Sequence, residues 1–263
     1  MKMILVLFCA FLPVAAQQPA PNLQISVNGG REVEVVKGWP LVVRGIIAHS
    51  DRRRATDSTP PLRLAPPGTT WTEKIAIRVF SASGEEVQWD LKLARVPADP
   101  GLVLPARSYA TVEWLLSEEA TAKLAEGDYR LAAFLEIEGG SGWNGKVRSV
   151  PVSIGVIPEP EVPVPEQIWE RARLRAEAAV LDGNIEDGVA RMDELLKVQP
   201  DNVEALQMQA TLLERGGNLV AALLSAMQAK IEFFKQCPAP EEPPEALLML
   251  VDRLWRSVLD SPE

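Results

Sequence analysis

The segment LDGNIEDGVARMDELLKVQPDN, residues 181–202, places a glycine-asparagine pair inside sequence that is otherwise typical of a helix. Glycine in a helix interior costs about 1 kcal/mol relative to alanine, so the pair predicts a break between two helices. A second pair, Gly217-Asn218, follows Gly183-Asn184 after about 34 residues, a period at which units of two helices repeat. In such a unit glycine ends the first helix because it tolerates left-handed geometry.

Apolar residues recur with a helical period on both sides of these pairs. They are Ile185, Val189, Met192, Leu195 and Leu196; then Val203, Leu206, Ala210 and Leu213; then Leu219, Ala222, Leu223, Ala226 and Phe233. Small residues stand where two helices of a unit must cross closely, namely Ala176, Gly188, Ala210, Ala222 and Ala229, and Pro200 closes the first unit. Over about 68 residues, counted from Trp169, the segment resembles the tetratricopeptide repeat family.

The resemblance departs from the family at its large aromatic positions, where Ala172, Ala179, Leu206 and Leu213 stand instead. A generic pair of antiparallel helical hairpins is the alternative. The resemblance implies that a protein or peptide partner binds on the concave surface of the first helices. The groove-lining positions of the family correspond here to Arg173, Glu177, Gln207, Thr211 and Glu214.

A last helix is predicted after the break CPAPEEPP, residues 237–244. Its apolar stripe comprises Leu247, Leu250, Val251, Leu254, Trp255 and Val258. Repeat arrays leave an apolar face at each end that something must cover. We expect this helix to cap the second unit by packing onto residues 219–233, with Trp255 among the packed side chains. The alternative is a detachable amphipathic helix that binds a partner.

The segment IPEPEVPVPEQ, residues 157–167, separates this helical part from what precedes it. Its prolines favour an extended, semi-rigid spacer over residues 158–165. Upstream, apolar residues alternate with period two in short runs at residues 23–27, 32–36, 41–48, 74–80, 87–93, 109–116, 129–137 and 147–156. Such runs, punctuated by turn residues, predict a β-sandwich over residues 17–157.

Gly127 and Tyr129 stand at the start of one predicted strand. This arrangement resembles the tyrosine corner of immunoglobulin-like folds, in which the phenol hydroxyl bonds upstream backbone. Leu131 replaces the disulfide cysteine that antibody domains have two residues later. Trp89 and Trp114 are expected in the sandwich core. The predicted fold is therefore multidomain, all-β plus all-α: an immunoglobulin-like β-sandwich followed by tetratricopeptide-like α-helical hairpins (residues 166–263) with a capping helix.

The loop from His49 to Thr70 is longer than a hairpin needs and carries Arg52, Arg53, Arg54 and Arg63. Loops beyond about 12–15 residues tend to be functional or disordered. An acidic partner, or the acidic helical part itself, could bind there. In an alternative interpretation, the sandwich resembles the intracellular proteinase inhibitor family and presents this loop to a protease.

The first residues, MKMILVLFCAFLPVAAQQPA, combine Lys2, an apolar run and the small residues Val14-Ala15-Ala16. This pattern predicts a secretory signal peptide over residues 1–16. Cys237 is then the only cysteine of the mature chain, so no intrachain disulfide can form, and whether it joins two chains stays open.

Charge is balanced before the linker, with sixteen basic and sixteen acidic residues in 17–157, whereas residues 158–263 carry ten and twenty. This distribution disfavours nucleic acid and anionic membranes as partners. The single histidine, His49, cannot build a zinc site or a Ser-His-Asp triad alone, and GGSGWNG (139–145) lacks the lysine and helix of a phosphate loop. That segment predicts a hairpin tip exposing Trp143.

We expect no cofactor and no metal. The sequence therefore predicts an exported, non-enzymatic interaction protein. An enzyme that uses an unrecognised carboxylate pair is a third possibility.

Processing provides a first test. Mass spectrometry of the exported protein is expected to show a chain that begins at Gln17, because cleavage follows the small-x-small pattern at residues 14–16. A retained Met1 in exported material would contradict the signal-peptide assignment.

Overall fold

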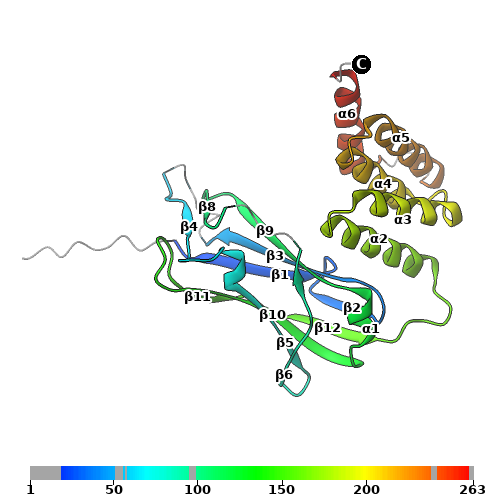
Figure 1. The fold of residues 1–263 in the computed structure, drawn as a ribbon. Coiled ribbons are helices and arrows are strands. Elements are labelled where there is room, and N and C mark those ends of the chain that lie inside the picture. The colour runs from blue at the N-terminus through cyan, green and yellow to red at the C-terminus, as the bar shows by residue number, and fades with distance from the viewer. Residues whose placement is uncertain (1–18, 51–55, 57, 95–98, 238–241, 261–263) are drawn as a thin grey trace, which may run out of the picture.

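The computed structural model describes residues 19–50, 56, 58–94, 99–237 and 242–260. Strands fill its first part and helices its second (Figure 1). The predicted signal peptide and the arginines at 52–54 lie outside the described residues. The predicted change from period two to helical period near residue 157 is confirmed.

Two sheets form the first part. One has the order β1 (Pro21–Val27), β3 (Leu41–His49), β9 (Tyr109–Leu116) and β7 (Lys92–Leu93). The other has the order β2 (Glu32–Val36), β12 (Val152–Ile157), β10 (Gly127–Ile137), β5 (Ile75–Ser81) and β6 (Glu86–Val87), with β11 (Gly145–Arg148) also on β10. Strand β2 runs parallel to β12, and the other pairs are antiparallel.

The alternating residues of both sheets meet in one core. Val43 of β3 and Trp114 of β9 lie in the same buried cluster as Leu131 of β10 and Ile154 of β12. Because successive side chains of a strand point to opposite faces, the sequence alternation places these residues on the inner faces. The two sheets therefore form a β-sandwich, as predicted.

The tyrosine geometry predicted at the start of β10 is present. The Tyr129 hydroxyl donates to the Ala125 carbonyl oxygen at 3.0 Å. Trp89 packs edge-to-face on Tyr129, with ring centroids 5.3 Å apart. Trp114 is buried and Trp89 is partly buried against the core, so both tryptophans serve the packing expected of them.

The long loop differs from the prediction. Residues Leu62–Leu64 form β4, which pairs with β8 (Leu102–Leu104), and the side chains of Leu62 and Leu64 are fully buried. A three-residue strand between prolines is too short to show a period in the sequence. Two of the predicted strands are each divided into two in the structure. Residues 87–93 contribute to β6 and β7, which belong to different sheets. Residues 147–156 contribute to β11 and β12, which are separated next to Pro151.

The prediction of an exposed Trp143 is wrong, because this side chain is 8% exposed and joins the sandwich core. Its backbone N–H donates to the Arg63 carbonyl oxygen at 2.8 Å. Gly142, at a φ of +116°, lies so close that a Cβ there would meet the same oxygen at 2.5 Å. The glycines of this segment thus let it fold back over β4.

The helical part contains α2 (Pro165–Leu181), α3 (Ile185–Val198), α4 (Val203–Arg215), α5 (Leu219–Gln236) and α6 (Glu245–Asp260). The short helix α1 (Glu118–Ala122) belongs to the sandwich and is capped by the Ser117 side chain. Consecutive helices α2 to α5 pack side by side as two hairpins.

The two glycine-asparagine turns have the same geometry. Gly183 and Gly217 have φ values of 84° and 81°. The Asn184 N–H donates to the Ala179 carbonyl, and the Asn218 N–H donates to the Leu213 carbonyl. Each asparagine side chain then caps the helix that follows. The predicted inter-helix turn is therefore used twice, once in each unit of two helices.

Helix α6 packs against α4 and α5. Leu247, Leu250 and Leu254 are buried there, and Val251 and Val258 are partly buried. The placement of Trp255 in this contact is wrong, because its side chain is 52% exposed. One residue beyond Leu254 is a rotation of about 100° around the helix, which turns the indole outward.

The two neighbours provide a matched test of this cap. Leu254→Ala is expected to lower the free energy of unfolding by about 2–5 kcal/mol, because it leaves a cavity beneath α6. Trp255→Ala is expected to change it by about 0.5 kcal/mol or less, as is usual for exposed positions. Urea unfolding followed by circular dichroism measures both. Equal losses in the two variants would show that α6 does not bury this stripe.

Candidate functional site

Helix α2 carries two apolar faces. One comprises Leu174, Ala178 and Leu181, at the i, i+4 and i+7 spacing of a single helix side. The other, with Ala176 and Val180, packs on α3 and α4. A helix that is apolar on both sides must be covered on both sides, so α2 needs a second neighbour besides the helices.

The sandwich is that neighbour. Leu174 packs in a buried cluster with Val36 and Trp39. Leu181 packs in another with Val42 and Leu115. The predicted spacer at 158–165 lies between the end of β12 and the start of α2, and the two parts also pack directly on each other. The prolines shape the connection, but the apolar face of α2 brings the helices onto the sandwich.

Charged side chains frame this contact. Arg171 pairs with Glu159 at 2.7 Å and lies 5.9 Å from the ring centre of Trp39. Arg175 donates to Glu118 of α1, with 3.0 Å between Nη2 and Oε2. Ion pairs at exposed positions contribute about 0–1 kcal/mol each, so they orient α2 more than they hold it.

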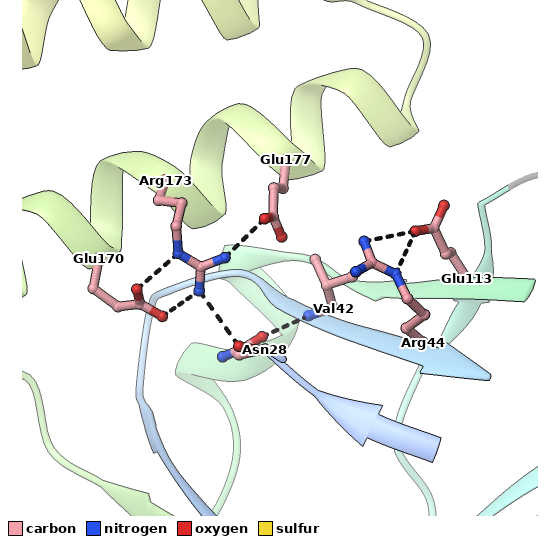
Figure 2. Close-up of polar contacts among 7 residues, drawn as sticks. All are labelled: Asn28, Val42, Arg44, Glu113, Glu170, Arg173 and Glu177. Carbon is pink, nitrogen blue, oxygen red and sulfur yellow. Dashed lines mark hydrogen bonds and ion pairs between the residues drawn. The ribbon is translucent and has the colours of Figure 1, made fainter. Parts of the chain in front are cut away.

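Arg173 lies at the centre of the contact (Figure 2). Its guanidinium donates to the carboxylates of Glu170 and Glu177 and to the Asn28 carbonyl oxygen, the last at 3.4 Å. Asn28 has a φ of 48°, and its side-chain oxygen accepts from the Val42 N–H at 2.9 Å. The hydrogen bonds that Arg173 donates to Glu170, and then the charge of Glu177, raise the pKa of Arg173 despite its partial burial.

A cleft of about 360 Å³ lies beside this contact, between the helices and the sandwich. It is lined by residues of β3 and β9 on one wall and of α2 and α4 on the other. These are Arg44, Thr111, Glu113, Glu177, Val180, Leu181, Met208, Thr211, Leu212 and Arg215. Arg44 and Glu113 are opposite each other in the β3–β9 register and form an ion pair at 2.9 Å (Figure 2).

The cleft follows from the repeat. The face of α2 that docks recurs one unit later in α4 as Met208, Leu212 and Arg215. In α2 this face reaches the sandwich, whereas in α4 it lines the cleft. Helix α2 packs directly on β3 and β9, whereas α4 faces these strands across the cleft.

The predicted groove residues have different positions. Glu177 and Thr211 line the cleft, while Arg173 is engaged at its edge. Gln207 lies one turn before Thr211, whose hydroxyl donates to the Gln207 carbonyl oxygen at 3.0 Å. Its side chain is not among those lining the cleft.

Glu214 is not among the residues that line the cleft. Its carboxylate accepts two hydrogen bonds from Arg253 of α6, at 2.8 and 2.6 Å, which raise the pKa of Arg253. This pair ties the last helix to α4. The predicted role of Glu214 in a partner-binding groove stays a prediction, and Arg52, Arg53 and Arg54 lie outside the described residues.

Sequence reasoning missed the sandwich wall of the cleft, Arg44, Thr111 and Glu113. Outward charges on strands are the usual solvated face of a sheet, and their pairing depends on register. Spacing in the sequence does not give that register.

The described ranges hold no group of three or more His, Cys, Asp or Glu side chains that could bind a metal. His49 is buried, and its Nε2 lies 3.2 Å from the Pro60 carbonyl oxygen. Among the helices that the structure describes, none has the length and apolar character needed to cross a membrane.

No family model matches the chain, and no curated protein matches it. Among solved structures, it is similar to a family 123 glycoside hydrolase from Clostridium perfringens, with 9% identity and a TM-score of 0.30 over 56% of this chain and 28% of the hydrolase. It is also similar to an aggregative adherence fimbria protein of enteroaggregative Escherichia coli, with 11% identity and a TM-score of 0.31 over 52% of this chain and 99% of that one.

A third similarity is to the Salmonella enterica SafA pilin in complex with the SafB chaperone. Identity is 10% and the TM-score is 0.28, over 56% of this chain and 60% of the other. At these identities and TM-scores, the similarities carry no inference about binding or activity.

The docking of α2 can be tested at its centre. Leu174→Ala is expected to weaken the contact with Trp39 by about 2–5 kcal/mol and to expose the linker, because the side chain is buried between the two parts. Cleavage after Glu161 by a glutamate-specific protease measures this.

Met208→Ala provides the control, because Met208 is the equivalent residue of α4 and packs on the helical cluster. It is expected to leave the linker cleavage rate unchanged. Equal cleavage of both variants, with circular dichroism showing both folded, would contradict the docking role of Leu174.

Proposed function

We propose that this chain is an exported, non-enzymatic binding protein whose cleft between sandwich and helices holds a short segment of a protein partner. In this proposal, residues 17–157 are an immunoglobulin-like domain and residues 166–263 are a tetratricopeptide-like domain with α6 as its cap. The observation that carries it is the cleft itself, in which the inner face of α2 and α4 is closed by strands β3 and β9.

The chemistry of the cleft supports a peptide as its ligand. Its volume of about 360 Å³ lies at the small end of the usual range for binding pockets, about 300–1,000 Å³. Charges of both signs, Arg44 and Arg215 with Glu113 and Glu177, flank the hydroxyls of Thr111 and Thr211. A chain segment with alternating donors and acceptors fits such walls, because buried polar groups need partners.

The apolar floor adds a contact for one side chain of the ligand. Val180 and Leu212 are buried beneath the polar walls, and Met208 can adjust its shape to different ligands. No aromatic side chain is among the lining residues. Since hot spots are rich in tryptophan, tyrosine and arginine, the expected affinity is modest and rests on the two arginines.

The alternative of a protease inhibitor acting through residues 49–70 receives less support. Leu62 and Leu64 of that segment are buried in β4 and paired with β8. Their side chains cannot enter a protease without breaking this pairing.

Peptide binding can be tested with a selection from a random peptide library, followed by fluorescence anisotropy with the selected peptide. Thr211→Trp is expected to weaken binding at least about tenfold, or 1.4 kcal/mol, because the indole fills the cleft. Ala190→Trp introduces the same side chain at an exposed position on α3 and is expected to bind like the parent. Failure to select any peptide, or equal binding by both variants, would refute the proposal.

A further inference from the structure

Helix α5 carries an apolar stripe on its outer face, comprising Val220, Leu224, Met227, Ile231 and Phe234. These side chains are 60%, 64%, 41%, 47% and 53% exposed. Their spacing alternates between four and three residues along α5. That spacing is the heptad seam with which one helix packs along another. An exposed apolar stripe of this length marks an interaction surface.

The repeat itself shows that the fold does not require this stripe. Each residue of α3 has an equivalent in α5, 34 positions later, and the burial patterns over these residues are nearly the same; α5 continues beyond the position at which α3 ends. The stripe positions correspond in the first unit to Glu186, Ala190, Asp193, Lys197 and Pro200. Three of these five exposed positions therefore carry charged residues in the first unit, whereas all five are apolar in the second. Because the first hairpin forms with charged residues at these positions, the hairpin fold does not require an apolar stripe there.

We propose that the stripe binds the stripe of a second copy of this chain, in an antiparallel pair of α5 helices about a two-fold axis next to Met227. In the antiparallel pair, the stripe of the second copy runs in the reverse direction. Its spacings of four and three residues then match those of the first copy to within one residue, so all five side chains come into contact. The smallest, Val220, then lies opposite the largest, Phe234 of the second copy, and Leu224 lies opposite Ile231 of the second copy. This matching of sizes is what a self-complementary surface requires.

The charges beside the stripe favour the antiparallel direction. Lys230 and Lys235 lie toward the end of α5, and α5 has no acidic residue in its first turn. In a parallel pair, Lys230 of one copy faces Lys235 of the other, which is a repulsive arrangement. In the antiparallel pair, both lysines approach the beginning of the other α5 instead.

That end of the helical part is acidic. Helix α3 has Glu186 and Asp187 in its first turn. Helices α3 and α5 run in the same direction, because the end of α5 approaches the end of α3 through the hydrogen bond from Gln236 to the Asp201 carbonyl. The lysines of one copy therefore meet the carboxylates of the other, which adds charge complementarity to the apolar contact.

This surface is independent of the proposed cleft. No residue of α5 lines the cleft, and the stripe points away from the α4 packing face that contains Ala222 and Ala226. A dimer through α5 therefore leaves both clefts accessible. Failure of peptide binding does not bear on this inference, and the converse also holds.

The test is the mass in solution of the purified chain over a range of concentrations, by light scattering after size exclusion. The parent is expected to reach twice the chain mass as concentration rises. Met227→Glu and Met227→Lys are each expected to weaken self-association at least tenfold, because like charges meet near the two-fold axis. An equimolar mixture of the two is expected to restore the dimer, since opposite charges then meet.

Met249→Glu provides the control, because Met249 is 63% exposed on α6 and lies outside the stripe. It is expected to associate like the parent, and circular dichroism checks that every variant is folded. A parent that stays monomeric at all concentrations would overturn the proposal. So would folded Met227 variants that dimerise like the parent, or a mixture that stays monomeric.

Discussion

The burial of one side of α2 against the sandwich is the contact on which the rest of the arrangement depends. Leu174 and Leu181 of α2 lie in two separate buried clusters, each completed by sandwich residues. Fully burying two such side chains is worth roughly 1.5–3 kcal/mol each. This exceeds the contribution of the exposed ion pairs around the contact, about 0–1 kcal/mol each. Apolar packing therefore sets the docking, and charge sets its orientation.

Arg173 shows how the polar part of the contact is completed. A guanidinium placed against a sheet must satisfy its donors or lose stability. Glu170 and Glu177, one turn to either side, accept from it within the helix, and Nη2, which donates to Glu170, also donates to the Asn28 carbonyl oxygen. Asn28 can present that oxygen because it adopts a left-handed conformation in the turn after β1. One arginine thus links a helix, a turn and the position of Glu177 at the cleft.

Much of the fold could be predicted from local patterns in the sequence. The period-two runs give most strands, and the glycine-asparagine turns give the helical hairpins, because both signals depend on neighbours within a few residues. What could not be predicted depends on partners distant in sequence. Leu62–Leu64 shows no period in three residues, and Trp143 follows a glycine-rich run that usually marks an exposed tip. The spacing of Leu174, Ala178 and Leu181 shows in the sequence that α2 has a second apolar face, but the sequence does not show that the sandwich covers it.

The same difference between local signals and long-range contacts explains which residues of the candidate site could be predicted. Repeat positions identified Glu177 and Thr211, because the helical frame recurs from one unit to the next. They did not predict the ion pair of Glu214 with Arg253, because Arg253 belongs to a later helix outside the two units. Arg44 and Glu113 required the strand register, which is a property of the folded sheet.

The two units of the repeat also show how one frame acquires different surfaces. At equivalent positions, Leu181 of α2 is buried against the sandwich and Arg215 of α4 lines the cleft. On the following helices, Asp193 of α3 is solvated where Met227 of α5 is an exposed apolar side chain. The glycine-asparagine turns have the same geometry in both units, so these differences at equivalent positions lie in the side chains. Where one unit has an apolar surface that the other unit folds without, that surface is a candidate for interaction with another molecule.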